Sequence, residues 1–329
     1  MSSYRNLFDQ VQVGYIVVES QKLSEWKRFG RDGFGLHLAE DNANLLAFRM
    51  DSHQRRLVIR RGPAEDIAAF GLQLRDEGTL QEVLKRLAER NIEVTEGSEE
   101  EAALRGVTRH YVFSGPKRLQ IELFTEALTT DEPLQMLSSG FVTGAGGMGH
   151  VAITSRRPEK MRRFWQEIFD ARTSDTIEEL IVGNTLDLHF LRLNERHHSV
   201  AIASVRDLRL DPIRTQVQHI NLVANSLDDV GSAFRRLQGL GFEMAHEIGQ
   251  HPNDKEISFY AISPSGFEFE LGCMALTVDE TNWKVGDYFG MSLWGHKPSN
   301  TSLPSYISVN AGNFRRGLKS LLHPEYSPL

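Results

Sequence analysis

Two stretches of the chain resemble each other: VGYIVVESQKLSEWKRFGRDGFGL at residues 13–36 and MGHVAITSRRPEKMRRFWQEIFDA at residues 148–171. Each begins as a short β-like run, passes through a polar turn and continues with helical period. Two further matches follow in the same order: LQEVLKRLAERNIEV (80–94) with VGSAFRRLQGLGFEM (230–244), and RLQIELF (118–124) with GFEFELG (266–272). This order predicts two homologous halves, each with two units of a strand, a helix and further strands.

The spacing of apolar residues predicts the elements within these halves. A helical stripe of period 3.6 is formed by Met161, Phe164, Trp165, Ile168 and Phe169, and a second one by Leu227, Val230, Ala233, Phe234 and Leu237. We expect both stripes to face the core. Residues 267–271 alternate between apolar and acidic side chains, as in a strand with one covered face. Strands that are short and bounded by turns, such as residues 263–266, favour an α+β fold with mixed or antiparallel sheets.

Length and composition exclude several classes of protein. At 329 residues the chain is expected to form roughly two domains of about 150 residues each. A net charge of −7 argues against a general nucleic-acid binder. The single cysteine, Cys273, excludes an internal disulfide and a Cys-rich metal site, and it fits a reducing compartment. With no apolar run of about 20 residues and no apolar segment in MSSYRNLFDQ, we expect a cytoplasmic protein with no membrane partner.

One motif is misleading. GAGGMG, residues 144–149, matches the G-x-G-x-x-G pattern of dinucleotide-binding turns. Such a turn needs a strand before it and a helix directly after it. Here the strand-like HVAI follows, so we expect a flexible linker instead.

Three metal-binding side chains are expected on one sheet face. In GHVAI, QHINL and FEFEL, the residues His150, His219 and Glu270 each lie opposite the apolar row of their strand. Two imidazoles and one carboxylate form a ligand set that leaves open positions and suits non-haem Fe(II). From the residues alone, three unrelated polar side chains on a half-exposed sheet explain the pattern equally well.

The first half serves as a comparison. By the repeat, Tyr15 stands in place of His150, an apolar residue near Phe70 in place of His219, and Glu122 in place of Glu270. Because one carboxylate alone does not hold iron, we expect the first half to be metal-free.

The sequence resembles the type I extradiol dioxygenases of the vicinal oxygen chelate superfamily, the group of the 2,3-dihydroxybiphenyl 1,2-dioxygenases. The resemblance covers nearly the whole chain and is more specific in the second half. It rests on GHVAI (149–153), NERHHSVAIA (194–203), HINLVANSLDDVG (219–231), HPNDKEISFYAISPSGFEFELG (251–272) and WGHK (294–297), and more loosely on RGVTRHYVF (105–113).

The resemblance implies an α+β fold of two homologous domains, each of two βαβββ modules that form a half-open barrel. It implies a metal-free N-terminal domain at 1–135, a linker at 136–148, a catalytic iron-binding domain at 149–290 and a C-terminal extension at 291–329. Members of the family are commonly homo-oligomers, so we expect one here.

The activity implied is extradiol cleavage of a substituted catechol, with both atoms of O₂ inserted, in aromatic-compound degradation. Fe(II), or Mn(II) with the same ligands, would be held by His150, His219 and Glu270. His198 matches the family's active-site base, whereas its neighbour His197 is expected to be structural. His251 and Tyr260 match the other acid–base and hydrogen-bonding residues. These residue types suit the roles, because imidazole titrates near neutral pH and a phenol donates to an anionic oxygen.

Six further residues are expected around the substrate. Ala152 and Asn221 lie two residues from the histidine ligands on the same face, and Phe190 and Ala203 match positions that line the family's ring pocket. Asn253 and Asp254 are expected to organise the site, although Asp254 suits a turn after Pro252 equally well.

Three alternatives remain within the superfamily. A 4-hydroxyphenylpyruvate dioxygenase-like enzyme would share the architecture and the iron ligands but would not require the NERHH and HPND motifs. A glyoxalase-type isomerase commonly draws four metal ligands from both modules. A non-catalytic ligand-binding protein would bind no iron and consume no O₂. The sequence leaves open whether the catechol is biaryl, naphthalenic, steroid-derived, alkyl or carboxylated.

Overall fold

The computed structural model describes residues 4–181, 183–207, 211, 213–298, 315, 317–318 and 320–329. The first half contains β1 (Val11–Ser20), α1 (Leu23–Lys27), the π-helical turn η1 (Arg28–Phe34), β2 (His37–Asp41), β3 (Leu45–Arg49), β4 (Leu57–Arg61), β5 (Asp66–Leu74), α2 (Glu77–Glu89), β6 (Val94–Glu96), α3 (Glu99–Arg105), β7 (Tyr111–Ser114), the short turn η2 (Pro116–Arg118) and β8 (Gln120–Phe124).

The second half follows the same order after a short turn, η3 (Gly144–Gly146). It contains β9 (His150–Thr154), α4 (Pro158–Phe169), β10 (Arg172–Ile181), β11 (Asn184–Arg192), β12 (Val200–Val205), β13 (His219–Val223), α5 (Leu227–Gly239), β14 (Met244–Gln250), β15 (Ile257–Ile262), β16 (Glu268–Cys273) and β17 (Gly286–Phe289). Because strand β9 follows residues 144–149 directly, this glycine-rich stretch is not a dinucleotide-binding turn.

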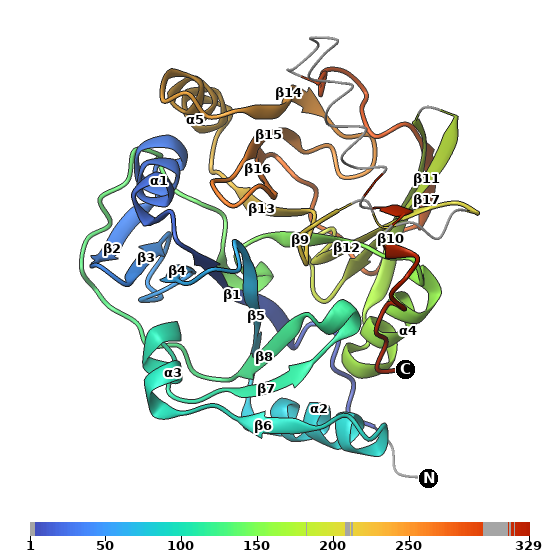
Figure 1. Ribbon diagram of the computed structural model, residues 1–329. Coiled ribbons are helices and arrows are strands. Elements are labelled where there is room, and N and C mark those ends of the chain that lie inside the picture. The colour runs from blue at the N-terminus through green and yellow to red at the C-terminus, as the bar shows by residue number, and fades with distance from the viewer. Residues whose placement is uncertain are drawn as a thin grey trace.

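Each half forms one curled, mixed sheet (Figure 1). The strand order is β2-β3-β4-β1-β5-β8-β7-β6 in the first sheet and β14-β15-β16-β13-β9-β12-β11-β10-β17 in the second. In both sheets the first strands of the two units pair antiparallel at the centre, β1 with β5 and β9 with β13. The predicted α+β fold of two homologous half-barrels is confirmed.

The strand registers of the two sheets coincide. In the second sheet Asn221 pairs with both His150 and Glu270, and in the first sheet Gly71 pairs with both Tyr15 and Glu122. Tyr15 and Glu122 therefore occupy the positions of His150 and Glu270, as the repeat predicts. The same register puts Ala69, next to Phe70, at the position of His219.

The helical stripes face the core with one exception. Every residue of the stripe on α4 is buried, from Met161 to Phe169. On α5, Val230, Ala233 and Leu237 are buried, but Leu227 is 48% exposed. The prediction was wrong for Leu227 because it is the first residue after the N-cap Ser226, where the helix has not yet come over the sheet.

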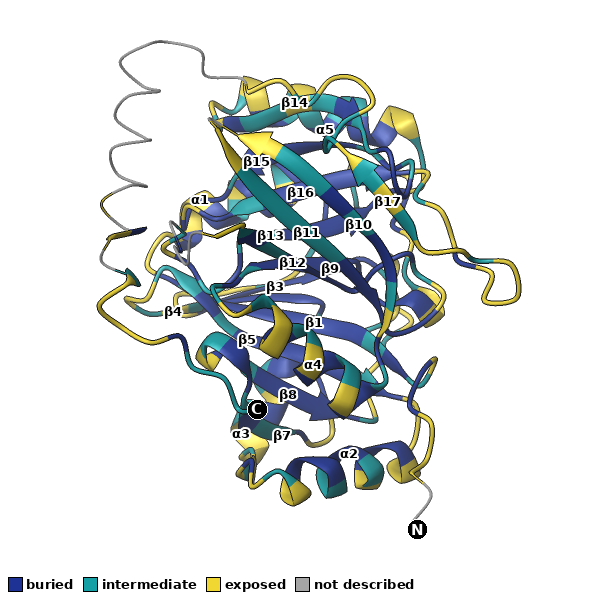
Figure 2. Cartoon of the chain, turned by 90° about the vertical axis from the view of Figure 1, so that its right-hand side faces the viewer, coloured by how far each residue is buried: buried dark blue, intermediate teal, exposed yellow. Residues whose placement is uncertain are grey.

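One hydrophobic core joins both halves. Phe29 and Phe34 of η1 pack on Phe269 of β16, with ring centroids 5.5 Å and 5.6 Å away. In return, Phe164 of α4 packs on Phe113 of β7. Buried stretches of β1, β9 and β12 lie together in the middle of the molecule (Figure 2). Because a core shared by both halves marks no border between them, the domain boundaries drawn from the sequence stay a prediction.

Two further predictions concern membrane-spanning helices and the C-terminal extension. Within the described residues, no helix is both long and apolar enough to cross a membrane. Much of the predicted extension 291–329 lies outside the described residues. Near its end, the carboxylate of Glu325 accepts hydrogen bonds from Ser155 Oγ at 2.5 Å and from the backbone N–H of Arg156 at 2.8 Å.

Candidate metal centre

Three neighbouring strands, β9, β13 and β16, bring His150, His219 and Glu270 together on one sheet face. His150 Nε2 lies 3.0 Å from His219 Nε2, and each of these nitrogens lies 3.4 Å from Glu270 Oε2. The apolar residues that alternate with them, such as Val151, belong to the core. The geometry predicted from alternation, three ligands on the face opposite the core, is thus present.

These atoms fit a metal ion. Donors about 2.1 Å from one ion at right angles to each other stand about 3.0 Å apart, close to the separations observed. His219 Nδ1 donates to the side-chain oxygen of Gln218, so its Nε2 carries the lone pair that faces the other two ligands. Burial lowers the pKa of His219 to about 3, which keeps the imidazole neutral, as a ligand must be.

The carboxyl of Glu270 is charged in this site. Burial opposes its ionisation, but hydrogen bonds from His150 and His251 outweigh burial and hold its pKa well below the usual range. A divalent cation held by Glu270, His150 and His219 would balance the charge of this buried carboxylate.

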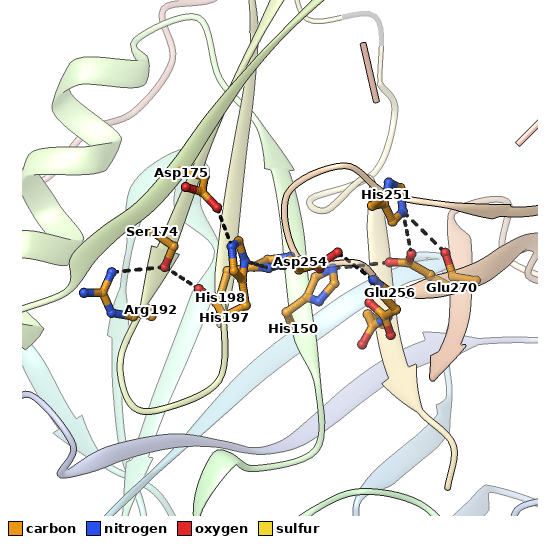
Figure 3. A network of polar contacts seen from close by, with 12 residues as sticks. His150, Ser174, Asp175, Arg192, His197, His198, His251, Asp254, Glu256 and Glu270 are labelled. Atoms are coloured by element: carbon orange, nitrogen blue, oxygen red, sulfur yellow. Dashed lines mark hydrogen bonds and ion pairs between the residues drawn. The ribbon is translucent and has the colours of Figure 1, made fainter. Parts of the chain in front are cut away.

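A polar wall borders the triad on the side of β14–β16. His251 Nε2 lies 2.9 Å from the Tyr260 hydroxyl and 3.2 Å from Glu270 Oε1 (Figure 3). Its Nδ1 donates to the carbonyl of Met291 at 2.7 Å. Burial lowers the pKa of His251, but the hydrogen bond and charge of Glu270 outweigh it and raise the value to about 9. His296 of the WGHK motif stacks on His251 at 4.4 Å.

His198 lies on the opposite side of the triad. Its ring is 3.9 Å from that of His150 and 4.9 Å from that of Phe190. Burial, followed by the charges of His150 and His197, holds its pKa well below the usual range. His197 lies next to His198, and its Nε2 donates to Asp175 Oδ2 at 2.6 Å rather than facing the triad. His198 is thus the one of the two that contacts a candidate ligand.

An apolar wall continues from His198 along β9–β12. Ala152, Ile177, Phe190 and Ala201 form a buried cluster on the same sheet face as the triad, with partly buried Leu188, Tyr288 and Met291 packed against it. The sequence prediction named Ala203, but Ala201 is the residue that pairs with both Ala152 and Phe190. Ala203 lies two residues farther along β12, opposite Leu188, and is only partly buried.

The remaining predicted residues surround a buried acid that sequence reasoning missed. Asn221 has no exposed surface, and its amide donates to both carboxyl oxygens of Glu256 at 3.2 Å and 3.3 Å. Asn221 therefore contacts Glu256 instead of presenting a surface to a ligand. Burial and the charges of Glu270 and Asp254 raise the pKa of Glu256 well above its usual range. The sequence signal that could have identified Glu256 is its position in HPNDKE, two residues after Asp254.

Asp254 forms the turn that the sequence allowed, and its role in organising the site stays a prediction. Its Oδ1 accepts from the backbone N–H of Glu256 at 3.0 Å, which closes the turn after Pro252. Its Oδ2 lies 3.8 Å from Nδ1 of His198. Asn253 is 2% exposed, and its Nδ2 has no hydrogen-bond partner among the described residues.

The corresponding position in the first half is closed by an internal cation. Arg105 Nη2 donates to Glu122 Oε1 at 2.6 Å, its Nε donates to Oε2, and the Tyr15 hydroxyl donates to Oε2 at 2.6 Å. Burial raises the pKa of Glu122, but the hydrogen bonds and charge of Arg105 outweigh it and lower the value. Glu122 is thus a fully buried ion-pair partner.

Comparisons with known proteins agree with this architecture. Residues 147–271 match the Glyoxalase/Bleomycin resistance protein/Dioxygenase superfamily, and residues 13–62 match Dihydroxybiphenyl dioxygenase BphC D1. The chain is 34% identical to a biphenyl-2,3-diol 1,2-dioxygenase of Metapseudomonas furukawaii over 87% of this chain and 93% of that protein. It is 29% identical to an iron-dependent extradiol dioxygenase of Rhodococcus jostii over 86% and 96%.

A solved structure agrees as well. The crystal structure of a halotolerant catechol dioxygenase, 31% identical in sequence, superposes with a TM-score of 0.80 over 90% of this chain and 97% of the other. Together with the relatives, this likeness extends over both halves and not only over the metal centre. The chain therefore belongs to the type I extradiol ring-cleavage dioxygenases of the vicinal oxygen chelate superfamily.

Proposed function

We propose that this enzyme cleaves the ring of a 3-substituted catechol beside its diol, inserts both atoms of O₂, and uses Fe(II) held by His150, His219 and Glu270. The observation that carries the proposal is the position of the triad. It lies between an apolar wall of small and aromatic side chains and a polar wall that contains His251 and Tyr260. A catechol has the same two-sided character, with an apolar ring and two vicinal hydroxyls.

The donor set supports iron as the metal. Two imidazoles and one carboxylate leave positions free and are the ligand set of non-haem Fe(II) oxygenases. When bound, such an ion supplies Lewis acidity for the diol oxygens and a redox path between the aromatic ring and O₂. Mn(II) accepts the same donors and is the second candidate. The iron dependence of the Rhodococcus jostii relative favours iron.

Three side chains handle protons around the substrate. His198, held neutral by burial, accepts a proton from a catechol hydroxyl at its ring nitrogen. Tyr260, whose pKa is raised well above its usual range by burial and by Glu270, stays protonated and donates to an anionic oxygen. His251, whose Nε2 lies 2.9 Å from the Tyr260 hydroxyl, supplies a proton later in the reaction.

The substituent is proposed to lie on the apolar wall. Ala152 and Ala201 leave room beside Phe190 because neither side chain extends beyond Cβ. A ring buried there gains roughly 25 cal/mol per Å² of apolar area. The Metapseudomonas furukawaii relative is named for biphenyl-2,3-diol, a catechol with a phenyl group at position 3.

The test is turnover by protein reconstituted anaerobically with Fe(II) or Mn(II). We expect one metal ion per chain, O₂ uptake equal to substrate consumed, a yellow ring-fission product, and a higher kcat/KM for biphenyl-2,3-diol than for catechol. Turnover of 4-hydroxyphenylpyruvate instead would favour that dioxygenase class. Bound metal with no O₂ uptake on any catechol would contradict the proposal.

A further inference from the structure

A buried carboxylate reaches His198 through its neighbour. Asp175 of β10 has no exposed surface, and its Oδ2 accepts from His197 Nε2 at 2.6 Å. Nδ1 of His197 in turn lies 3.1 Å from Nδ1 of His198. Figure 3 shows Asp175, His197 and His198 in sequence, leading toward His150. Burying a carboxylate costs free energy unless the charge is paired or hydrogen-bonded. The position of Asp175 beside His197 therefore needs an explanation.

The hydrogen bonds fix where the protons lie. Asp175 Oδ1 accepts from the backbone N–H of Gly286 at 2.6 Å, so both carboxylate oxygens act as acceptors. We take His197 as neutral, with its one proton on Nε2 toward Asp175, so that its Nδ1 is an acceptor. It can only accept from Nδ1–H of His198.

We propose that Asp175 and His197 are positioning residues that hold His198 as the Nδ1–H tautomer, with the lone pair on Nε2. This inference rests on the proposed function, in which His198 accepts a proton from the catechol. Without the pair, His198 could carry its proton on either nitrogen, and the Nε2–H form cannot act as a base at that atom. Phe190 against one side of the His198 ring and His150 against another restrict its rotation.

The surroundings of Asp175 hold it rigidly. Its backbone pairs with Phe190 of β11 on one side and with Gly286 of β17 on the other. The preceding residue, Ser174, donates from Oγ to the carbonyl oxygen of His197. Trp283 donates to the Ser174 carbonyl at 2.9 Å and packs edge-on against His197 at 5.3 Å. The residues between β16 and β17 thus complete the support of His197.

A different explanation is a second metal ion between His197, His198 and Asp254, whose donor atoms also lie within 4.8 Å of one another. Against it, Nε2 of His197 is already engaged with Asp175, and the gap of 3.8 Å to Asp254 is wide. Metal stoichiometry separates the two explanations, because a second site predicts two ions per chain.

The decisive variant is Asp175→Asn. The N–H of Gly286 can bond only to the amide oxygen, so the amide NH₂ must face His197 Nε2. His197 then carries its proton on Nδ1 and donates to His198, which reverses the tautomer of His198. We expect kcat to fall about 100-fold, within the range for loss of a general base, with KM and metal content unchanged. Thr176→Ala, on the same strand, removes a hydrogen bond to Asp287 and leaves the imidazoles and their support untouched, so it is the matched control and should retain kcat.

The second readout is independent of turnover. Nitrogen-15 NMR of histidine-labelled full-length protein, loaded with diamagnetic Zn(II), distinguishes the two tautomers of His198. We expect Nδ1–H in the wild type and Nε2–H in Asp175→Asn. Nε2–H in the wild type, two ions per chain, or an equal loss of kcat in Thr176→Ala would overturn the proposal. If no catechol is cleaved by the wild type, the proposed function fails, and the tautomer result still stands or falls by itself.

Discussion

The two halves of this molecule place a glutamate at the same point of the same sheet and neutralise it in different ways. Glu122 is held by the guanidinium of Arg105 and the hydroxyl of Tyr15. Glu270 instead faces Nε2 of His150 and Nε2 of His219, each 3.4 Å from its Oε2. A side-chain cation is permanent and leaves no free coordination position. The comparison shows that one arrangement of strands can hold either a structural ion pair or an open metal centre. Which of the two forms depends on the side chains beside the glutamate, Tyr15 and Arg105 in the first half and His150 and His219 in the second.

The halves also differ in the space beside these glutamates. By strand register, Val17 and Val58 of the first half correspond to Ala152 and Ala201 of the second. The valines pack with Tyr15 in a buried cluster, whereas the alanines border the apolar wall next to the metal centre. Smaller side chains thus accompany the ligands, as a substrate site requires.

The largest effect should come from removing the ligand carboxylate. Glu270→Ala is expected to lose bound metal and all measurable turnover, because two imidazoles and no carboxylate remain. Glu122→Ala, at the corresponding position of the first half, is expected to keep one ion per folded chain. Metal analysis after dialysis checks both. Full occupancy in Glu270→Ala would show that the ligands lie elsewhere.

Replacing the proposed base should separate chemistry from metal binding. His198→Gln is expected to retain the metal and lose about 10²–10⁴-fold in kcat, since the glutamine amide does not accept a proton. Steady-state kinetics normalised to bound metal is the measurement. A wild-type rate would assign the role to another residue.

The ion pair of the first half can be broken without touching the second. Arg105→Met leaves the buried carboxylate of Glu122 without its cation and should reduce the free energy of unfolding by about 3–5 kcal/mol. The double variant Arg105→Met/Glu122→Gln should recover part of the loss. Chemical denaturation gives both values, and turnover per folded, metal-loaded chain should stay unchanged. Equal stability of Arg105→Met and the wild type would mean that the pair is not formed.

The smallest effect tests the space beside the ligands. Ala201→Val gives the second half the side chain of the first, and it should reduce kcat/KM for biphenyl-2,3-diol about tenfold, a difference of about 1.4 kcal/mol. Catechol, which has no substituent to displace, should be affected less. Equal losses on the two substrates would indicate that the substituent lies elsewhere.

Alternation along single strands predicted that the three candidate ligands share one sheet face, and the internal repeat predicted two homologous halves, whereas the half-barrel fold was implied by the family resemblance. His150, His219 and Glu270 follow from which face each strand covers, a property of a few consecutive residues. Asp175 could not be predicted this way, because its contacts to His197 and Gly286 join residues 22 and 111 positions apart. The sequence could not tell Ala201 from Ala203 as the neighbour of Phe190, because that depends on how β11, β12 and β9 pair and not on any one of them.

The core shared between the halves has a consequence for unfolding. Because η1 packs on β16 and α4 packs on β7, neither half can lose its structure without exposing the apolar surface of the other. A ligand that binds only the native state adds its binding free energy to the whole cooperative unit. An ion bound to three side chains of the second half should therefore slow amide hydrogen exchange in β7 and β8 of the first, far from any atom that it touches.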